Sequence, residues 1–380
     1  MRVIFDARHL QTVSRTRGIG RYSRGLLAAF ARRAPPDVRW TLLRLATFPP
    51  AAPLALPPHD EIRVMRPRRP ELAMLALDAP MLSFELAGYG SDSVYHSVQL
   101  GLPALRRACA VLTIHDLAPL RWPDHYLRWP HVRVGHMWQY AMAQRADAVI
   151  VPSQATARDV TERLGIPASR IRVIAEATGP DFAPPPRDEG RRVARERFGI
   201  PERYVLYVGQ FDPRKNMDGL LAAFAQAAGS DPELRLVIVG ELGKLEGHLR
   251  AAMRRTRAPL ERVVVTGYVD DATLAALYAG AECLLHAALL EGFGLTPLES
   301  LAAGTPVVGY RAGAVLEVVG DAGILVDPAE PAALGEALVS LLSSETLSAD
   351  LRDRAASRAA LFSWDLAADE TLALYRSVAG

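Results

Sequence analysis

Residues 291–299 read EGFGLTPLE and residues 302–308 read AAGTPVV, the most specific stretch of the chain. Gly292 and Gly294 have no Cβ, so the backbone there can approach a ligand closely. Pro297 suits the first turn of a helix, because its missing N–H would have no partner in that turn. The remaining free N–H groups of such a turn would point at a bound group. The stretch therefore predicts a glycine-rich binding loop that leads into a helix.

The two carboxylates of this stretch have seven residues between them. Glu291 is expected in the loop and Glu299 within the first turns of the helix, so both can face one pocket without pairing with each other. Two separated carboxylates that accept hydrogen bonds from hydroxyl groups suit a sugar and a ribose. A lone GxG with surface glutamates would be an ordinary loop, but the full nine-residue string favours a binding site.

On both sides of this stretch, short β-branched runs alternate with Ala- and Leu-rich helical patterns, which predicts βαβ units and parallel sheets. The strands expected in the first half are Arg2–Asp6, Trp40–Ala46, Val94–Ser97, Val111–Ile114, Ala148–Val151 and Arg172–Ile174. Those expected in the second half are Tyr204–Val208, Leu234–Val239, Arg262–Val265, Cys283–His286, Pro306–Val308 and Ile324–Val326. The predicted fold class is α/β.

The chain has 380 residues, and single hydrophobic cores rarely grow past about 250 residues. Residues 176–190 include Gly179, Pro180 and the run Pro184–Pro186 and show no helical or strand period, so we place the hinge there. The expected organisation is a first domain at 1–180, a linker at 181–190, a second domain at 191–360 and a C-terminal segment at 361–380. Two domains of similar size make a central cleft possible.

The C-terminal segment is expected to be a helix that completes either domain or packs back on the first. Ser363 is its candidate N-cap, and Leu366, Leu372 and Tyr375 recur at helical spacing.

Composition excludes several classes of protein. Apolar residues make up 50% of the chain and charged residues 23%, as in globular proteins. Lys and Arg number 44 against 42 Asp and Glu, which argues against a nucleic-acid partner. Met1–Asp6 enter a β-type run at once, and no stretch reaches about 18 uninterrupted apolar residues, so neither a signal peptide nor a membrane span is expected. Cys109 and Cys283 are the two cysteines, without a CxxC pattern, which fits a reducing cytoplasm.

One heptapeptide, GLLAAFA, occurs at both Gly25–Ala31 and Gly219–Ala225. Each copy is expected in the helix after the first strand of its half, which suggests a duplication, although an Ala- and Leu-rich chain also produces such matches by chance. Both helices begin after a turn with basic residues and Gly or Pro. Two helix N-termini, each carrying about half a positive charge, can then hold a diphosphate between them.

Arg214 and Lys215 lie at the strand-to-helix turn that precedes the second copy. Cations are disfavoured at a helix N-terminus, so their position there indicates an anion. Two cations and the helix N–H groups would neutralise a diphosphate and stabilise it as a leaving group. A metal has this role in other enzymes, and because the chain has no evident Asp-x-Asp site we expect neither a metal nor another cofactor.

His115 and Asp116 follow a buried strand that reads VLTI. A residue in this position emerges at the carboxyl edge of the sheet, where α/β folds place their ligand sites. A lone histidine there would usually be structural, but the adjacent Asp116 makes the pair a candidate for a sugar site.

Several stretches together resemble retaining glycosyltransferase family 4, and the resemblance spans nearly the whole chain. EGFGLTPLE is similar to the E-x7-E motif of that family, and TIHDL at 113–117 to its His-Asp pair. TRGIGRY at 16–22 resembles the N-terminal glycine-rich loop, and DAVIVPSQATARD at 147–159 the segment that closes the first domain. YVGQFDPRKN at 207–216 resembles the phosphate-binding stretch of the second domain. The set is most similar to bacterial mannosyl- and hexosyltransferases of polysaccharide or glycolipid assembly.

This resemblance implies the GT-B fold, in which an acceptor-side and a nucleotide-sugar-binding Rossmann-like domain face each other across a central cleft. It also implies a retaining, metal-independent hexosyltransferase. The first candidate donor is GDP-mannose, followed by UDP-hexoses, and the acceptor is a glycan or a lipid-linked glycan. Retention in such enzymes is commonly explained by attack on the same face as the leaving group, whose phosphate takes the acceptor proton. The implied location is the cytoplasm, with the inner face of the membrane as a further site.

The resemblance and the local chemistry together assign two sets of site residues. The catalytic set is His115, Asp116, Glu291, Arg214 and Lys215. The donor- and nucleotide-binding set is Gly18, Gly20, Gly209, Arg214, Lys215, Glu291, Gly292, Phe293, Gly294, Leu295, Thr296 and Glu299. One position departs from the family pattern: many members have Arg directly after the strand-ending glycine. Here that residue is Gln210, and Arg214 is the candidate substitute.

Two regions raise the question of membrane contact. Residues 121–138 mix three tryptophans with basic residues, and a second basic patch contains Arg63, Arg66, Arg68 and Arg69. Such residues can touch lipid headgroups or stack on sugars. A partly buried helix with a solvated face, together with a proline-broken basic loop, explains them equally well.

Other function classes stay open. A sugar-nucleotide epimerase or a glycan phosphorylase has the same two-domain build. A phosphorylase needs a pyridoxal-phosphate lysine, and the lysines of this chain, Lys215 and Lys244, have no such setting. An epimerase offers no comparable match to EGFGLTPLE. A two-lobed binding protein without turnover is the non-enzymatic alternative, against which the intact Glu291, Glu299 and His115 argue.

Overall fold

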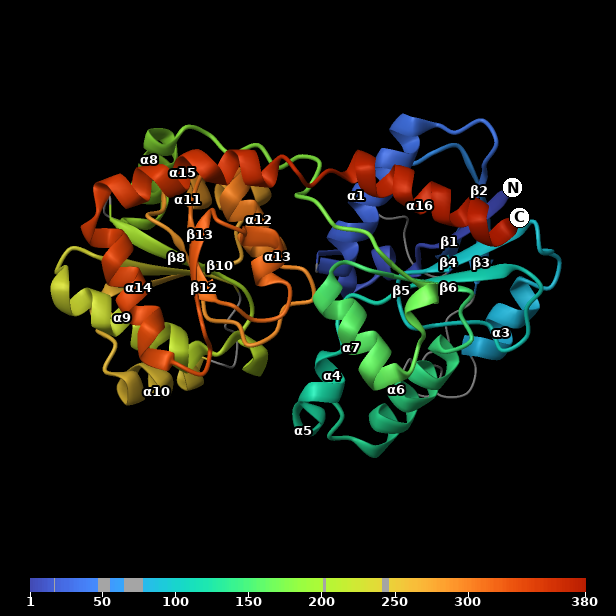
Figure 1. Cartoon of the computed structure of the whole chain (residues 1–380), viewed down its shortest axis with the longest axis horizontal. Coiled ribbons are helices and arrows are strands. Elements are labelled where there is room, and N and C mark those ends of the chain that lie inside the picture. The colour runs from blue at the N-terminus through green and yellow to red at the C-terminus, as the bar shows by residue number, and fades with distance from the viewer. Residues whose placement is uncertain (17, 47–54, 65–77, 201–202, 241–245) are drawn as a thin grey trace. The chain divides into compact units, whose positions relative to one another are not determined.

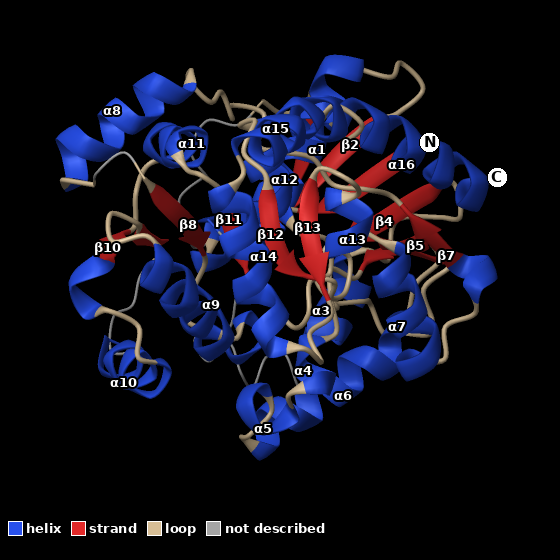
Figure 2. Cartoon of the chain, turned by 60° about the vertical axis from the view of Figure 1, so that its left-hand side comes forward, coloured by secondary structure: helices blue, strands red, loops and turns tan. Residues whose placement is uncertain are grey.

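The structure is a computed structural model that describes residues 1–380 except 17, 47–54, 65–77, 201–202 and 241–245. The chain divides into two compact units, one of Met1–Pro180 with Ser363–Gly380 and one of Asp181–Phe362. Each unit is a parallel sheet between helices (Figure 1), which Figure 2 shows as red strands among blue helices. Within the described part of the chain, no helix combines the length and the apolar character that crossing a bilayer requires.

The sheet of the first unit has the strand order β3-β2-β1-β4-β5-β6-β7 among the described residues. Its strands are β1 (Arg2–Asp6), β2 (Arg39–Leu45), β3 (His59–Val64), β4 (Ser93–Ser97), β5 (Cys109–Thr113), β6 (Ala148–Val151) and β7 (Ile171–Val173). Its helices are α1 (Gly18–Arg33), α3 (Asp78–Glu85), α4 (Ala118–Arg121), α5 (Pro123–Tyr126), α6 (Pro130–Ala143), α7 (Gln154–Leu164) and α16 (Trp364–Ala379).

The sheet of the second unit has the order β10-β9-β8-β11-β12-β13, again among the described residues. Its strands are β8 (Tyr204–Val208), β9 (Arg235–Val239), β10 (Val263–Gly267), β11 (Leu284–His286), β12 (Val307–Tyr310) and β13 (Gly323–Val326). Its helices are α8 (Arg187–Phe198), α9 (Met217–Ser230), α10 (Glu246–Thr256), α11 (Asp271–Gly280), α12 (Leu295–Ala302), α13 (Val315–Val319), α14 (Pro331–Ser343) and α15 (Glu345–Ala359).

Strand β8 shows why the strands are short apolar runs. Val205 and Tyr207 join a hydrophobic cluster with α9 and α14, while Tyr204 and Leu206 join a second cluster with α8 and α11. Successive side chains of a strand point to opposite faces. A parallel strand that is covered on both faces must therefore be apolar at nearly every position.

All the strands expected from the sequence are present, with ends within one or two residues of the expected bounds. The sequence does not predict β3, because Val64 is its single buried residue and the strand reads HDEIRV. One residue of the basic patch lies on this strand: Arg63 is exposed and pairs with Glu61 at 2.9 Å. The other three, Arg66, Arg68 and Arg69, lie outside the described residues.

The linker expected at 181–190 ends earlier in the structure, so its predicted end is wrong. Helix α8 begins at Arg187, so the last residues of the predicted linker form its first turn. Asp188 and Glu189 lie in that turn, where acidic side chains interact favourably with the helix dipole. The run Pro184–Pro186 has no helical period, so the sequence does not predict that a helix begins directly after it.

The C-terminal helix belongs to the first unit, where α16 packs against α1 and β4. Ser363 caps it, as expected, by accepting a hydrogen bond from Leu366 N at 3.1 Å. Leu372 and Tyr375 are buried, but Leu366 is 51% exposed, contrary to the expectation. Trp364 provides the buried contact instead, and its Nε1 donates to Thr178 O at 2.7 Å.

The two GLLAAFA copies lie in α1 and α9, the helices that follow β1 and β8, yet their first glycines have different surroundings. A Cβ on Gly25 would lie 2.2 Å from Trp364 Cε2, whereas one on Gly219 would lie 2.4 Å from the side chain of Asn216. Gly25 therefore allows α16 to pack closely on α1. Gly219 instead makes room for the residue that caps α9.

We predict that Gly25→Ala destabilises the first unit by about 1–3 kcal/mol, because the added methyl group overlaps the Trp364 ring. Gly229→Ala is the matched control, since Gly229 is an exposed helical glycine with no described atom within 4 Å of its Cβ position. This substitution should stabilise the protein by about 0.5–1 kcal/mol. Urea denaturation followed by tryptophan fluorescence measures both effects. If Gly25→Ala were neutral or stabilising, the packing role of Gly25 would be wrong.

Candidate functional site

In the second unit, the strand order reverses at β8, which pairs with β9 on one side and with β11 on the other. Open parallel sheets bind ligands outside the carboxyl ends of the strands at such a reversal. The chain leaves β8 through Gly209 and leaves β11 through Ala287. Both loops carry residues that the sequence assigns to the donor site, so this edge of the sheet is the candidate site.

The loop after β8 enters α9 through a short 3-10 helix, Pro213–Lys215. The Asp212 carboxylate accepts a hydrogen bond from Arg214 N at 3.0 Å. Asn216 adopts a left-handed conformation, with φ 49°, and caps α9 by accepting a hydrogen bond from Gly219 N at 3.2 Å. These contacts fix the two cations of the loop at the N-terminus of α9, where backbone N–H groups favour an anion.

The loop after β11 is held by the first loop and by the chain that follows β12. Leu289 N donates to Arg214 O at 2.7 Å, and Ala314 N donates to Glu291 O at 3.0 Å. Gly313 has φ 58°, and a Cβ there would lie 2.3 Å from Glu291 O. Only glycine permits this approach without strain, so Gly313 helps to fix the backbone of Glu291.

Glu291 is buried and forms an ion pair with Lys215. His286, at the end of β11, is also buried, and its Nε2 lies 3.2 Å from the same carboxylate oxygen. Burial disfavours the ionised carboxylate, but Lys215, His286 and Arg214 outweigh it and hold the pKa of Glu291 well below its usual value. Burial also lowers the pKa of His286, although the Glu291 carboxylate beside it acts in the opposite direction. The site therefore keeps an ionised carboxylate in a largely dry environment.

The sequence does not single out His286, because a histidine at the end of an apolar strand gives no pattern of its own. Its role is to contact the Glu291 carboxylate from the strand side while Lys215 contacts it from the first loop. Lys215 can bind an anionic ligand in addition to Glu291, because an ammonium group has three N–H donors.

Glu299 lies on α12 and is buried against α11, where Tyr278 Oη donates to Glu299 Oε2 at 3.0 Å. Tyr278 is itself held, because Thr305 Oγ1 donates to its carbonyl oxygen at 2.8 Å. Each carboxylate of the nine-residue motif thus has a buried partner of its own, Lys215 for Glu291 and Tyr278 for Glu299. The assignment of Glu299 to a ribose stays a prediction.

The rest of the motif starts α12 at Leu295, as the sequence predicts. Gly294 precedes the helix with φ 109°, and Phe293 packs edge-to-face on Phe362 with ring centroids 5.7 Å apart. The residues assigned to the donor are buried or half-buried here: Gly209, Gly292, Phe293, Gly294, Leu295 and Thr296.

In the first unit, His115 emerges just after β5, as expected. Its Nδ1 lies 2.9 Å from Glu176 Oε1, and Glu176 is 3% exposed. The sequence places Glu176 at the start of the unpatterned stretch 176–190, but it belongs to the first unit and is buried there. Because a carboxylate accepts hydrogen bonds, the contact places a proton on Nδ1. Nε2 has no hydrogen-bond partner among the described residues.

The glycine-rich stretch at 16–22 supports this histidine. The Tyr22 ring packs edge-to-face on His115 with centroids 4.8 Å apart, and Tyr22 Oη lies 3.3 Å from Thr113 Oγ1. Gly20 is buried, and a Cβ there would lie 2.3 Å from a backbone oxygen of the preceding turn. Gly18 is exposed at the first position of α1. The predicted contact of Gly18 and Gly20 with donor phosphates stays a prediction.

Asp116 has a local role beside His115. Its Oδ1 accepts a hydrogen bond from Ala118 N at 2.9 Å and so starts the turn into α4.

A cluster of charged side chains that the sequence does not predict lies at the end of β1. Arg8 forms ion pairs there with Asp6 at 2.7 Å and with Asp78 at 2.6 Å. Burial disfavours ionised Asp6, but Arg8 outweighs it and lowers the pKa of Asp6. Asp78 is 70 residues from Arg8 in the sequence, so only folding brings them together.

Comparison with known proteins identifies the class. Residues 16–178 match the family model described as Glycosyltransferase Family 4, and residues 191–359 match the model described as Glycosyl transferases group 1. The fold is the GT-B fold of glycosyltransferases. Sucrose-phosphate synthase from Thermosynechococcus elongatus superposes with a TM-score of 0.77 at 22% identity, covering 100% of this chain and 99% of that one. The chain belongs to the GT-B glycosyltransferases that combine these two domains.

Two curated relatives come from Escherichia coli. O-antigen chain mannosyltransferase B is 29% identical, over 88% of this chain and 83% of that protein. Serotype-specific mannosyltransferase WbdA is 26% identical, over 96% of this chain and 46% of WbdA. This chain therefore spans less than half the length of WbdA.

We predict that Glu176→Gln lowers the turnover of glycosyl transfer by roughly 10- to 100-fold, because His115 loses the charge-assisted hydrogen bond that fixes its tautomer. Nucleotide binding should not change, since Glu176 belongs to the first unit, whereas the loops after β8 and β11 belong to the second. Glu162→Gln, at an exposed position on α7, is the control and should be fully active. Steady-state kinetics and nucleotide calorimetry measure the two quantities. Full activity of Glu176→Gln would refute the positioning role.

Proposed function

We propose that this chain transfers a hexose from a nucleotide diphosphate sugar to a glycan or lipid-linked acceptor, with retention of configuration and without a metal ion. The observation that carries the proposal is the buried Lys215–Glu291 ion pair where the strand order reverses, beside the N-terminus of α9. It joins a group that binds an anion to a group that stabilises positive charge.

The first half of the proposal concerns the diphosphate. Lys215 has donors beyond those that Glu291 uses, Arg214 lies next to it, and the N–H groups of the first turn of α9 are directed along the helix axis. An anion bound there would be neutralised without a divalent ion, and the same groups would stabilise it as the leaving group. This is the basis for proposing that turnover is independent of metal.

The second half concerns the sugar. An ionised, buried carboxylate is best suited to a centre that becomes positive, as the anomeric carbon does when it resembles an oxocarbenium ion. We assign Glu291 this role, with the acceptor attacking from the face that the phosphate leaves and the phosphate oxygen taking the proton of the acceptor hydroxyl. His115, with Nδ1 held by Glu176 and no hydrogen-bond partner at Nε2 among the described residues, is assigned to a hydroxyl of the transferred hexose.

The names of the two relatives from Escherichia coli support mannose as the transferred sugar and a polysaccharide chain as the acceptor. GDP-mannose is accordingly our first candidate donor, and UDP-hexoses are next. We assign the enzyme to the cytoplasmic side of the membrane, where nucleotide sugars and lipid-linked acceptors meet.

A thermal-shift panel of GDP, UDP, ADP and dTDP sugars tests the donor. A donor at about 100 times its dissociation constant should add about 2.7 kcal/mol to the free energy of unfolding. GDP-mannose should give the largest shift, and EDTA should leave both the shift and the transfer rate nearly unchanged. Lys215→Ala should weaken binding of the donor and the free diphosphate by about 1.5–3 kcal/mol, with no change for the nucleoside. Activity that is lost in EDTA and restored by manganese would rule out the metal-independent mechanism.

The two motif carboxylates should separate turnover from binding. We expect Glu291→Gln to lower turnover by a factor of about 100 or more with nearly unchanged nucleotide affinity, since it acts on the transition state. Glu299→Gln should instead weaken nucleotide diphosphate binding, if this carboxylate accepts hydrogen bonds from the ribose. Glu336→Gln, exposed on α14, is the control for the substitution itself. Calorimetry and donor kinetics measure the effects, and normal turnover of Glu291→Gln with an unchanged melting temperature would show the assignment to be wrong.

We extend the proposal to membrane contact through α6 and the residue before it. Trp129, Val134, Met137 and Trp138 are 54%, 60%, 41% and 49% exposed. The last three recur at i, i+3 and i+4, so they share one face of the helix. The Arg128 guanidinium stacks over the Trp129 ring at 4.8 Å. An exposed apolar face with tryptophans and arginines is typical of a helix that lies in a lipid headgroup region.

Flotation with vesicles of phosphatidylglycerol tests this contact. The protein should bind, and Trp129→Ser with Trp138→Ser should reduce binding by at least about tenfold, because two exposed aromatic side chains that would enter the headgroup region are removed. Leu366→Ser, at an exposed apolar position on α16, should bind like the parent. If the double variant bound as tightly as the parent, the α6 face would not be the contact.

A further inference from the structure

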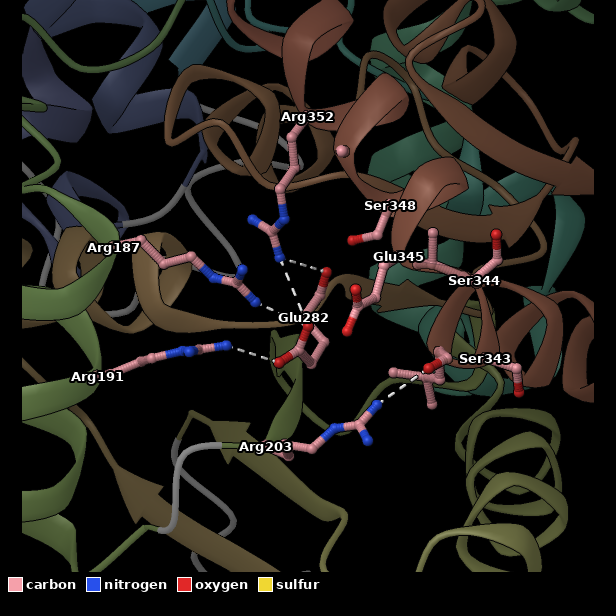
Figure 3. A pocket seen from close by; sticks show the side chains of 12 residues that line it. Arg187, Arg191, Arg203, Glu282, Ser343, Ser344, Glu345, Ser348 and Arg352 are labelled. Carbon is pink, nitrogen blue, oxygen red and sulfur yellow. Dashed lines mark hydrogen bonds and ion pairs between the residues drawn. The ribbon is translucent and has the colours of Figure 1, made fainter.

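A cavity of about 640 Å³ lies in the second unit, at the edge of the sheet opposite the candidate donor site (Figure 3). Arg203 and Glu282, which precede β8 and β11, line it, together with α8 and the junction of α14 and α15. The donor loops leave the carboxyl ends of β8 and β11, whereas this cavity is at their amino ends. Because the strands are parallel, the two sites are at opposite edges of one sheet.

Three arginines converge on one carboxylate in this cavity, as the dashed lines in Figure 3 show. Arg187 and Arg191 from α8 lie 2.7 Å and 2.8 Å from the two oxygens of Glu282, and Arg352 from α15 lies 3.8 Å from it. One carboxylate cannot neutralise three guanidinium groups. The lining as a whole has four arginines and two glutamates, a net charge of four minus two, or +2, and Arg203 also pairs with Asp231, outside the lining, at 3.1 Å.

Arg352 donates to three backbone oxygens, but much of the hydrogen-bonding capacity of Arg187 and Arg191 is unused among the described residues. A guanidinium has five N–H donors, but Arg187 and Arg191 each donate one side-chain hydrogen bond within the described part of the chain, to Glu282 in both cases. Burial, and next the charge of Arg187, lower the pKa of Arg352 to about 10. Burial is thus the larger cause, and the positive charge of Arg187 adds to it, while Glu282 acts in the opposite direction.

A helix N-terminus adds to the positive field of the cavity. Helix α15 begins beside it, with Ser344 as the N-cap and the Ser348 hydroxyl in the first turns. The α8 arginines are partly open to solvent, with side chains 35% and 22% exposed, so an anion in the cavity could reach them. Guanidinium groups match the geometry of phosphate oxygens and bind them through paired hydrogen bonds.

We propose that this arginine cavity, defined by Arg187, Arg191, Arg203 and Arg352, binds a phosphoryl group. Its volume lies within the range of about 300–1,000 Å³ typical of small-molecule sites, so it has room for more than a bare phosphate. The phosphoryl group belongs either to a soluble phosphorylated metabolite or to a lipid headgroup. This site is distinct from the proposed donor site and does not depend on the assignment of the donor.

Calorimetry on the full chain tests the proposal with inorganic phosphate, glucose 6-phosphate and, as the uncharged control, glucose. The measurements are made on the parent protein and on Lys215→Ala, in which the proposed donor site is weakened. Phosphate and glucose 6-phosphate should bind and glucose should not. Arg187→Gln with Arg191→Gln should weaken binding by at least about tenfold, since charge-assisted hydrogen bonds are lost. Arg192→Gln, on the same helix but outside the cavity, is the matched control and should bind like the parent.

Hydrogen exchange on the unmodified protein gives a second test that does not depend on how the variants fold. Phosphate should slow amide exchange at residues 341–348 and leave residues 291–299 unchanged. Vesicles of phosphatidylglycerol, with phosphatidylcholine vesicles as control, decide the source: protection by phosphatidylglycerol alone indicates a headgroup, and tight binding of glucose 6-phosphate a soluble ligand. No saturable binding, or binding that Lys215→Ala removes while the arginine double variant retains it, would overturn the proposal.

Discussion

The ion pair of Lys215 and Glu291 is the interaction on which the candidate site depends. It joins the loops after β8 and β11, which come from strands that are adjacent in the sheet but far apart in the chain. Removing one partner of a buried pair typically costs about 3–5 kcal/mol, because the other charge is left uncompensated. In the proposed reaction, a phosphate would meet a cation already fixed in place at Lys215, and the anomeric centre would meet a fixed carboxylate. Such fixed charges need no reorganisation during the reaction.

In the first unit, the candidate site residue His115 is held by a carboxylate and by ring packing. Glu176 holds His115 from the end of the domain, and Tyr22 packs against the ring from α1. The Trp364 ring in turn packs on Tyr22, with centroids 5.6 Å apart. Thus α16, the last helix of the chain, supports a side chain that follows β5. Return of the C-terminus to the first unit is for this reason part of how His115 is positioned.

The balance of positive and negative side chains differs between the carboxyl and the amino ends of the strands in the second sheet. At the carboxyl edge, the lysine and the glutamate are matched one to one. At the amino edge, Glu282 faces several arginines and the cavity keeps an excess of positive charge. Arg352 also donates to Gly304 O at 3.2 Å, directly after α12, the helix that carries Glu299. The arginine cavity is thereby connected, through the side chain of Arg352, to the end of a helix of the proposed donor site.

The sequence by itself determined the fold class, nearly every strand, the start of α12 at the glycine-rich motif and the placement of Lys215 and His115 at strand ends. These features are local, because strand periodicity, glycine conformation and helix capping depend on neighbouring residues. Only the tertiary structure decided that Lys215 pairs with Glu291, that Glu176 is a buried partner of His115 and that Arg8 joins Asp6 and Asp78. It also decided that Arg187 starts a helix whose arginines surround Glu282. Each of these contacts joins residues from different elements, often 60 or more positions apart, as in the separation of 61 between His115 and Glu176. Partners at such distances are chosen by how the helices and strands pack, which no local pattern records.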